Sequence, residues 1–189
     1  MVFMKRFFYF FAFYLACATG VLAQAASVTN AVVADDERGY LVKVGDMVPD
    51  FTMNLLDGSS IRMSDLRGKV VMLQFTASWC SVCRKEMPFI EKDIWLKHQS
   101  NPKFALFGID KDEKADVVAK FAKSVGVTYP MALDHQSVIF ELFAQAKAGV
   151  TRNVIVGEDG RIVMLTRLYN EEEFKAMVET IDRLLAPKP

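Results

Sequence analysis

The chain contains few of the residues that bind metals or cross-link a fold. Its 189 residues include three cysteines and two histidines. Zinc needs four protein ligands, or three and a water molecule, and His98 and His135 are far apart in the sequence with no H-x-x-x-H spacing. We therefore expect no bound metal, and no cofactor is expected either. Both histidines are interpreted as polar surface residues, one near a helix end and one in a loop.

The sequence also lacks an apolar run long enough to cross a membrane comfortably. The longest, FFYFFAFYLACA, has about a dozen residues, with Lys5 and Arg6 before it and a small-residue segment ending at Ala23 after it. A spanning helix needs about 20 apolar residues, whereas this layout is typical of a secretory signal. We predict that residues 1–23 are a signal peptide.

Two other interpretations of this leader are open. It could stay in place as a membrane anchor, or Cys17 could carry a lipid after cleavage, although Tyr14 stands where lipidation sites have an aliphatic residue. Cleavage after Ala23 removes Cys17, Lys5 and Arg6, which leaves 21 basic residues against 23 acidic ones. The resulting net charge of −2 argues against nucleic acid as a partner.

One globular domain is predicted after the leader. With 189 residues, of which 52% are hydrophobic, the chain can bury one sizeable core, and nothing in its length requires a second domain. Residues 24–40 are rich in alanine, valine, aspartate and small polar residues without a sustained period, so we interpret them as a flexible spacer. The domain is predicted to span residues 41–189.

Hydrophobic periodicity and turn residues predict strands that alternate with helices. Asp57-Gly58 is a tight-turn signal between two short strands, which indicates an N-terminal hairpin. Val70–Ala77 is the apolar run expected of a buried central strand. The later elements are predicted as a helix over 81–98 that bends at Pro88, a strand over 103–110, a helix over 115–126, a strand over 129–134, a helix over 137–144, strands over 153–157 and 161–168, and a helix capped by Asn170. This order indicates an α/β fold with a central mixed β-sheet flanked by helices on both faces.

The segment WCSVC places Cys80 and Cys83 three positions apart, where the central strand gives way to a helix. Side chains at that spacing lie roughly 5–6 Å apart on a helix, which suits a disulfide that opens and closes. The positive helix start is expected to lower the pKa of the Cys80 thiol, so that Cys80 attacks and Cys83 resolves the mixed disulfide. A purely structural disulfide is the alternative, but a four-residue loop contributes little stability.

At these residues the chain resembles a known family. WCSVCRKEMP resembles the active-site segment of thioredoxin-like proteins, specifically the exported TlpA/ResA-type thiol-disulfide oxidoreductases of the redoxin superfamily. The likeness extends through VGDMVPDFTMNLLDGSSIRMSDLRGKVVMLQF, FAKSVGVTYPMALD and GVTRNVIVGEDGRIV, and covers about residues 41–185. It implies a thioredoxin-like fold, Cys80 as nucleophile, Cys83 as resolving thiol and Pro88 as the helix kink. It also implies Trp79 as a wall of the substrate groove, with burial in the core as the alternative.

The chain departs from the family pattern opposite the cysteines. Where these folds usually carry a cis-proline, this chain has Thr151. A cis bond before a residue other than proline costs about 3–4 kcal/mol, so we expect the Val150–Thr151 bond to be trans. Val150, Thr151 and Arg152 are expected to line the substrate groove. Arg152 either stabilises the Cys80 thiolate or, as the alternative, faces solvent.

A second departure concerns the proton that Cys83 must lose. Thioredoxins place a buried aspartate six residues before the nucleophile, and this chain has Gln74 there. Glutamine forms hydrogen bonds but cannot take a proton. Water, Glu86 or another group must therefore accept the proton of Cys83.

These features predict an exported, periplasmic thiol-disulfide oxidoreductase that acts on protein disulfides through a mixed-disulfide intermediate. Ser81 and Val82 supply no charge between the cysteines, which favours a reductase over an oxidase or isomerase. A reductase outside the cytoplasm implies a membrane-embedded electron donor as a partner. A redoxin-type peroxidase and a non-catalytic binding domain are the alternatives, but LQFTASWC lacks the proline and threonine spacing of the peroxidases, and both thiols are present.

Overall fold

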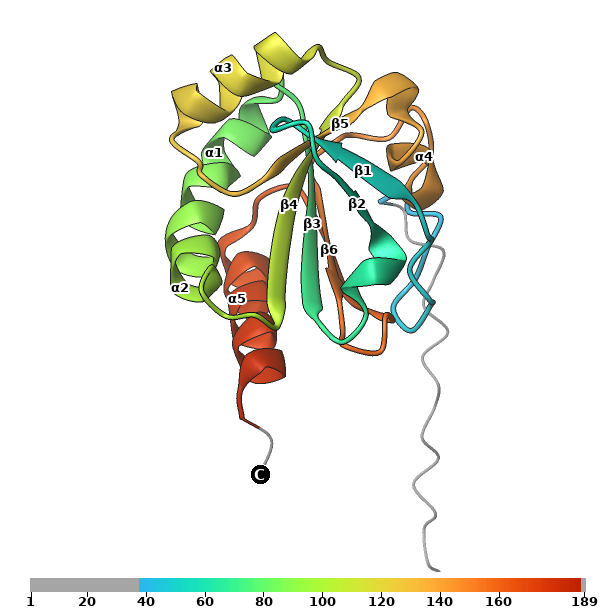
Figure 1. Cartoon of the computed structure of the whole chain (residues 1–189), viewed down its shortest axis with the longest axis vertical. Helices are drawn as coiled ribbons and strands as arrows, with labels where there is room; N and C mark the ends of the chain where they lie inside the picture. Colours follow the sequence, from blue (N-terminus) through green and yellow to red (C-terminus); the bar gives the residue numbers. More distant parts are fainter. Residues whose placement is uncertain (1–37, 188–189) are drawn as a thin grey trace, which may run out of the picture. The chain divides into compact units, whose positions relative to one another are not determined.

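The computed structural model of the protein describes residues 38–187, and these contain a seven-stranded mixed β-sheet with helices on both faces (Figure 1). The strand order is β2-β1-β5-β4-β3-β6-β7. The predicted signal peptide over 1–23, Cys17 within it and most of the predicted spacer lie outside the described residues. Between residues 38 and 187 there is no helix with both the length and the apolar character needed to cross a membrane.

The predicted N-terminal hairpin is confirmed. Strand β1 (Thr52–Leu55) pairs antiparallel with β2 (Ser60–Arg62). Gly58 in the turn has a φ of +87°, a conformation that glycine adopts at little cost. A short 3-10 helix, η1 (Met63–Leu66), follows β2 and buries its first and last side chains.

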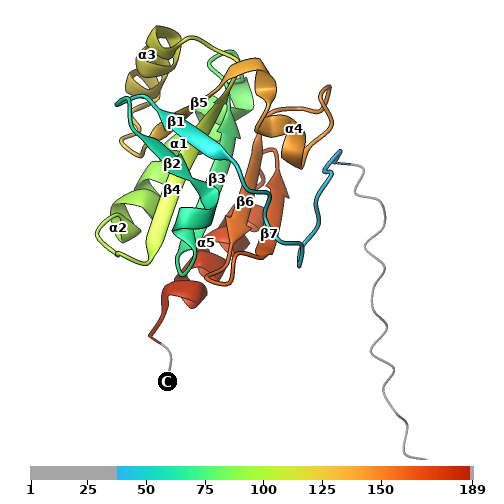
Figure 2. The ribbon, with the colours of Figure 1, turned by 45° about the vertical axis from the view of Figure 1, so that its right-hand side comes forward.

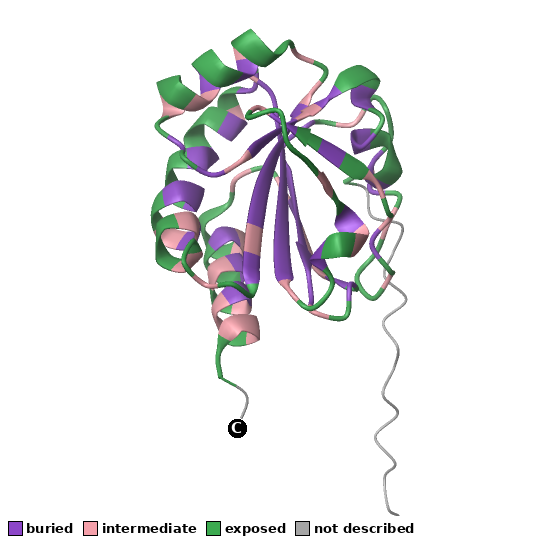
Figure 3. Ribbon diagram, viewed as in Figure 1, coloured by how far each residue is buried: buried purple, intermediate pink, exposed green. Residues whose placement is uncertain are grey.

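The predicted central strand is β3 (Val70–Thr76), and all of its residues are buried. It pairs in parallel with β4 (Phe104–Lys111) and antiparallel with β6 (Arg152–Val156). Strand β4 pairs in parallel with β5 (Met131–Asp134). Strands β3 and β4 are buried along most of their length (Figure 3), as expected for parallel strands covered on both faces.

The helix predicted over residues 81–98 is confirmed in extent, but it is less regular than its apolar pattern indicates. It consists of α1 (Ser81–Ile90), one wide π-helical turn η2 (Glu91–Trp95) and α2 (Leu96–His98). In η2, the buried Glu91 accepts hydrogen bonds from the backbone N–H (2.8 Å) and the hydroxyl (2.6 Å) of Thr128. The wide turn is therefore tied to the loop that leads into β5.

Two more helices cover the same face of the sheet as α1 (Figure 1). Helix α3 (Ala115–Val125) connects β4 to β5 and ends at Gly126, which has a φ of +76° and forms the predicted C-cap. Helix α5 (Glu171–Leu185) closes the chain. The cap predicted at Asn170 is confirmed, because its side chain accepts hydrogen bonds from two backbone N–H groups of the first turn of α5.

The other face of the sheet is covered by η3 (His135–Ser137) and α4 (Phe140–Phe143). Phe75 of β3 packs against the rings of Phe140 and Phe143, with centroid distances of 5.6 and 5.2 Å. Strand β7 (Ile162–Arg167) pairs antiparallel with β6 and forms one edge of the sheet (Figure 2). The predicted mixed sheet with helices on both faces is thus confirmed.

Two predictions about single residues are wrong. Tyr40, assigned to the spacer, is buried, and its hydroxyl donates to the carbonyl oxygen of Thr166 at 2.5 Å. His98, assigned to the surface, is half-buried with its Nε2 2.8 Å from Oδ1 of Asp182 on α5. Both contacts join segments more than 80 residues apart in the chain, so no local pattern indicates them. His135 is exposed, as predicted.

Candidate active site

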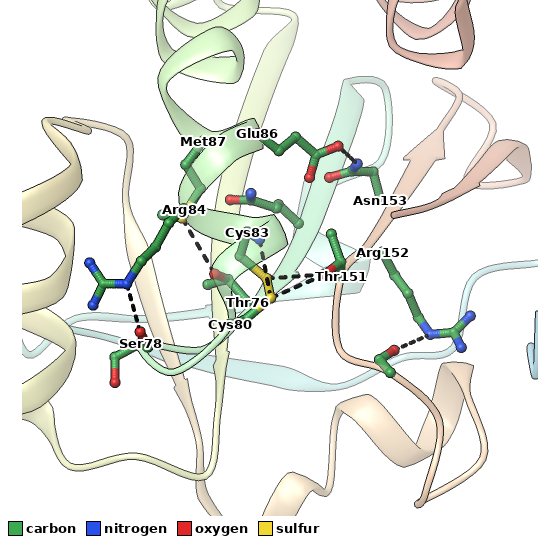
Figure 4. Close-up of a disulfide and its surroundings, with 12 residues drawn as sticks. Thr76, Ser78, Cys80, Cys83, Arg84, Glu86, Met87, Thr151, Arg152 and Asn153 are labelled. Atoms are coloured by element: carbon green, nitrogen blue, oxygen red, sulfur yellow. Dashed lines mark hydrogen bonds between the residues drawn. A yellow bond between two sulfur atoms is a disulfide. The ribbon is translucent and has the colours of Figure 1, made fainter. Parts of the chain in front are cut away.

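The two cysteines lie at the junction of β3 and α1, where they form a disulfide (Figure 4). Their Cα atoms are 5.3 Å apart, a separation that a disulfide bridges without backbone movement. Cys80 is 7% exposed and Cys83 is fully buried. The sulfur that an incoming molecule can approach therefore belongs to Cys80.

Cys80 lies at the start of the helix, as predicted, and is the N-cap residue of α1. Its backbone is extended, and its Sγ accepts a hydrogen bond from the backbone N–H of Cys83 at 3.1 Å. The first turn of α1 contains no acidic residue, so no carboxylate there opposes the positive end of the helix dipole. In the reduced protein, this environment favours a thiolate on Cys80.

Thr151 lies opposite the disulfide and points its hydroxyl at it (Figure 4). Its Oγ1 is 3.1 Å from Sγ of Cys80 and 3.3 Å from Sγ of Cys83, and because disulfide sulfurs carry no hydrogen, the hydroxyl is the donor. The Val150–Thr151 bond is trans, because residues 38–187 contain no cis peptide bond. Where the family pattern has a proline, this chain thus brings a hydroxyl within reach of both sulfurs.

Arg152 has neither of the environments predicted for it. It is fully buried, and its guanidinium points away from the sulfurs (Figure 4). The guanidinium donates to the carbonyl oxygens of Gly149 and Arg38 and lies 4.3 Å from the centroid of the Tyr40 ring. It therefore neither faces solvent nor stabilises the thiolate, but joins the loop before β6 to the segment that precedes β1.

The residues predicted to line the groove differ in how far they are exposed. Trp79, in the turn before Cys80, is 67% exposed, so its interpretation as a core residue is wrong. Val150 and Thr151 are each 3% exposed, and little of either side chain is open to a substrate. Leu168, which the sequence analysis missed, is 44% exposed, and its N–H donates to the carbonyl oxygen of Thr151. Its φ of +63° is strained for leucine, and no sequence signal marks that strain.

Glu86 belongs to a buried polar network next to α1. Its Oε1 accepts a hydrogen bond from Nδ2 of Asn153 at 2.8 Å, and the same amide nitrogen donates to Oγ1 of Thr166 at 2.9 Å. Burial raises the pKa of Glu86 to about 7, although the hydrogen bond from Asn153 acts in the opposite direction. Glu86 follows Cys83 by one helical turn, which puts both on one side of α1. A carboxyl with a pKa near neutrality can accept a proton and return it.

Gln74 and Pro88 are the other two residues predicted to support the site. Gln74 is fully buried in β3, and its Oε1 accepts a hydrogen bond from the Tyr129 hydroxyl at 2.7 Å. Pro88 lies inside α1, where it has no N–H to donate to the carbonyl of Arg84. The bend at Pro88 stays a prediction. Within residues 38–187, no three histidine, cysteine, aspartate or glutamate side chains are grouped so as to hold a metal ion.

Asn153 is a site residue that sequence reasoning missed. It is the second residue of β6 and is fully buried, with Gln74 of β3 and Thr166 of β7 as its partners on the adjacent strands. A buried amide needs hydrogen-bond partners, and its Nδ2 finds them in Glu86 and Thr166. The available signal was an asparagine at the start of the apolar run NVIV.

Comparisons with known proteins cover nearly all of the described chain. A family model described as Redoxin matches residues 43–185. The chain is similar to the thiol-disulfide oxidoreductases ResA of Geobacillus thermodenitrificans, at 28% identity over 74% of this chain and 79% of the relative, and of Bacillus subtilis, at 29% identity over 79% of this chain and 76% of the relative.

Solved structures agree with these relatives. A structure described as a putative protein disulfide isomerase from Bacteroides thetaiotaomicron is 62% identical, with a TM-score of 0.76 over 78% of this chain and 92% of that chain. A putative thiol:disulfide interchange protein DsbE from Chlorobium tepidum is 24% identical, with a TM-score of 0.67 over 77% of this chain and 99% of that chain. The second likeness concerns the fold alone.

We predict that Glu86 makes the stability of the oxidised protein depend on pH. Its pKa is raised from 4.5 to about 7 on folding, so its contribution to stability is present in full below about pH 4.5 and is lost as the pH rises through about 7. Glu86→Gln keeps an acceptor for Asn153 and removes the ionisation. It should flatten the fall in the free energy of unfolding between pH 5 and 8 by as much as about 3 kcal/mol.

Urea unfolding at several pH values measures this change. The exposed Glu179 of α5 supplies a matched control, Glu179→Gln, which should keep the wild-type slope. An unchanged slope in Glu86→Gln would contradict the prediction.

Proposed function

Because this chain belongs to the redoxin family, as a thiol-disulfide oxidoreductase of the TlpA/ResA type, we propose that it reduces protein disulfides outside the cytoplasm through a mixed disulfide on Cys80. The observation that carries the proposal is the pair of unequal sulfurs at the start of α1. Cys80 caps the helix and is 7% exposed, whereas Cys83 is fully buried one turn further in.

The proposed reaction transfers two electrons from the reduced pair to the substrate. The Cys80 thiolate attacks one sulfur of a substrate disulfide, the substrate S–S bond breaks, and the second substrate sulfur leaves as a thiolate that takes a proton. Cys83 then loses its proton and attacks the sulfur of Cys80. The mixed disulfide breaks, the first substrate sulfur leaves, and the Cys80–Cys83 disulfide forms.

Three side chains are assigned to these steps. Thr151 donates its hydroxyl hydrogen to the Cys80 thiolate, which its position 3.1 Å from that sulfur supports. Glu86 accepts the proton of Cys83, which its burial and its pKa of about 7 support. Gln74 orients the polar groups around Glu86 without titrating.

Trp79 is proposed to contact the substrate. It is 67% exposed and immediately precedes the nucleophile. An exposed aromatic ring beside the reacting sulfur offers apolar surface to the chain that carries the target disulfide.

The direction of the reaction and the location of the protein are proposed from the sequence. Ser81 and Val82 place no charge between the cysteines, which favours a reductase, whereas a hydrogen bond from Thr151 to the thiolate stabilises the reduced form and acts in the opposite direction. The leader over residues 1–23 supports export to the periplasm. Electrons must then reach the pair from a membrane-embedded donor.

We predict that Cys83→Ser traps substrates. Without the resolving thiol, the mixed disulfide on Cys80 persists, so a chain expressed with its leader should accumulate covalent adducts in the periplasmic fraction. Dithiothreitol should release them, and mass spectrometry identifies the captured proteins. Purified wild-type protein should also reduce insulin disulfides.

The matched control is Cys80→Ser, which should capture far less because Cys83 is buried. Failure of Cys83→Ser to capture any protein, together with failure of the wild-type pair to equilibrate with glutathione, would rule out the proposed function. Reactivation of scrambled ribonuclease by Cys83→Ser, without insulin reduction by the wild type, would indicate an isomerase instead.

We also predict that Thr151→Val slows the reaction of Cys80. Valine has nearly the shape of threonine but no hydroxyl, so the thiolate loses one hydrogen bond, worth about a factor of ten for a charged acceptor. Alkylation of the reduced protein by iodoacetamide at pH 7 measures the change. Thr151→Ser, which keeps a hydroxyl, should react within about twofold of the wild type. Equal rates for Thr151→Val and Thr151→Ser would contradict this role.

A further inference from the structure

The turn that carries Trp79 and Cys80 is held from two sides at Ser78. On one side, the Glu113 carboxylate accepts two hydrogen bonds, from the Ser78 backbone N–H at 2.5 Å and from the Ser78 hydroxyl at 2.6 Å. On the other side, Nε of Arg84 donates to the Ser78 carbonyl oxygen at 2.8 Å (Figure 4). All three polar groups of Ser78 are thus engaged two residues before the nucleophile.

Glu113 reaches Ser78 from the loop between β4 and α3, and this loop is itself fixed. Asp112 has a φ of +59°, a left-handed conformation that aspartate adopts more readily than most residues. Its N–H donates to the carbonyl oxygen of Asp134 at 3.0 Å, and its carboxylate accepts from the N–H of Gln136 at 2.8 Å. These two hydrogen bonds hold the loop in the conformation that presents Glu113 to the active-site turn.

A second carboxyl, that of Asp110, is relevant to Glu113. Asp110 pairs with Thr76 across β3 and β4, and its side chain is fully buried. Among residues 38–187, no N–H or O–H group donates to either of its carboxyl oxygens, and the Glu113 carboxyl is among the groups that raise the pKa of Asp110. A buried carboxylate without a donor is costly. Asp110 therefore keeps its proton and can donate it in a hydrogen bond to Glu113.

The charges around Asp110 act in the same direction. Burial is the largest cause, followed by Glu113 and then Asp134 of β5, and together they raise the pKa of Asp110 to about 8. The neighbouring cation, Lys111, directs its Nζ to the carbonyl oxygen of Ala146 at 3.0 Å and over the Phe140 ring at 3.7 Å.

We propose that Glu113 is a positioning residue for thiol-disulfide exchange, held by a proton that it shares with Asp110. The proton fixes Glu113, Glu113 fixes Ser78, and Ser78 fixes the Trp79–Cys80 turn against Thr151. This inference rests on the proposed function, because it assigns Cys80 as the nucleophile.

The arrangement makes the active-site turn sensitive to alkaline pH. When Asp110 loses its proton, two carboxylates lie side by side in a buried site and repel each other. Glu113 then withdraws from Asp110 and loosens its two hydrogen bonds to Ser78. The reactivity of Cys80 should therefore fall as the pH rises through about 8, where thiolate formation alone would raise it or leave it level. If Glu113 had only a structural role, replacing it would change the stability of the protein, and the reactivity of Cys80 would not fall above about pH 8.

The experiment measures the rate of alkylation of Cys80 by iodoacetamide in the reduced full-length chain between pH 6 and 9.5. In the wild type, the rate should rise and then fall above pH 8. In Asp110→Asn, whose amide donates to Glu113 at every pH, the rate should match the wild type at pH 7 and stay level above pH 8. In Glu113→Gln, the rate at pH 7 should be lower by about tenfold, the factor for one charge-assisted hydrogen bond, and the fall should be absent.

Glu179→Gln on α5 serves as the control and should follow the wild type. Thermal unfolding establishes that each variant folds. If Glu113→Gln does not fold, Ser78→Ala takes its place, because it removes one of the two hydrogen bonds to Glu113 and should slow alkylation by a smaller factor than tenfold.

A rate and a pH profile equal to wild type in Glu113→Gln, or in Ser78→Ala where that variant replaces it, would overturn the inference. A fall above pH 8 that persists in Asp110→Asn would overturn the role of Asp110. Insulin reduction by the wild type separates the proposed function from the positioning role of Glu113. If the wild type does not reduce insulin, the proposed function is wrong. If it does, and Glu113→Gln alkylates at the wild-type rate with the wild-type pH profile, only the positioning role is wrong.

Discussion

The hydrogen bond from the Cys83 backbone N–H to the Cys80 sulfur is the interaction on which the rest of the site depends. It exists because the buried strand β3 ends at Thr76 and the chain enters α1 at Ser81, which leaves the first N–H groups of the helix without intrahelical partners. A sulfur at the cap shares the positive helix end, and a sulfur one turn further in does not. The chemical difference between two identical side chains thus follows from where a strand stops and a helix starts.

Polar side chains from three segments of the chain lie around the junction of β3 and α1. From the loop before β6, the Thr151 hydroxyl reaches both sulfurs. From the loop after β4, Glu113 reaches the turn before Cys80 through its hydrogen bonds to Ser78. Glu86 lies on α1 itself. Burial raises the pKa of Glu86 to about 7 and that of Asp110 to about 8, so neither carboxyl carries a full negative charge at neutral pH.

Short-range patterns predicted most of the fold and the reacting pair, and long-range contacts account for the errors. The alternation of strands and helices, the Gly126 and Asn170 caps and the position of Cys80 all follow from residues within a few positions of one another. The environment of Arg152 does not, because the Tyr40 ring that it packs against is more than 100 residues away in the sequence. Likewise, a count along the chain located the position of Thr151, but only the pairing of β3 with β6 brings its hydroxyl to the sulfurs.

The inequality of the two sulfurs is the central claim, and differential alkylation of the reduced wild-type protein tests it most directly. Across a pH series, mass spectrometry distinguishes the product alkylated at Cys80 from the product alkylated at Cys83 and so reports the rate of each thiol separately. Cys80 should react at least about tenfold faster than Cys83 at pH 7, because a thiolate at a helix start is more nucleophilic than a buried thiol. Equal rates, both following the pH profile of free cysteine in solution, would contradict it.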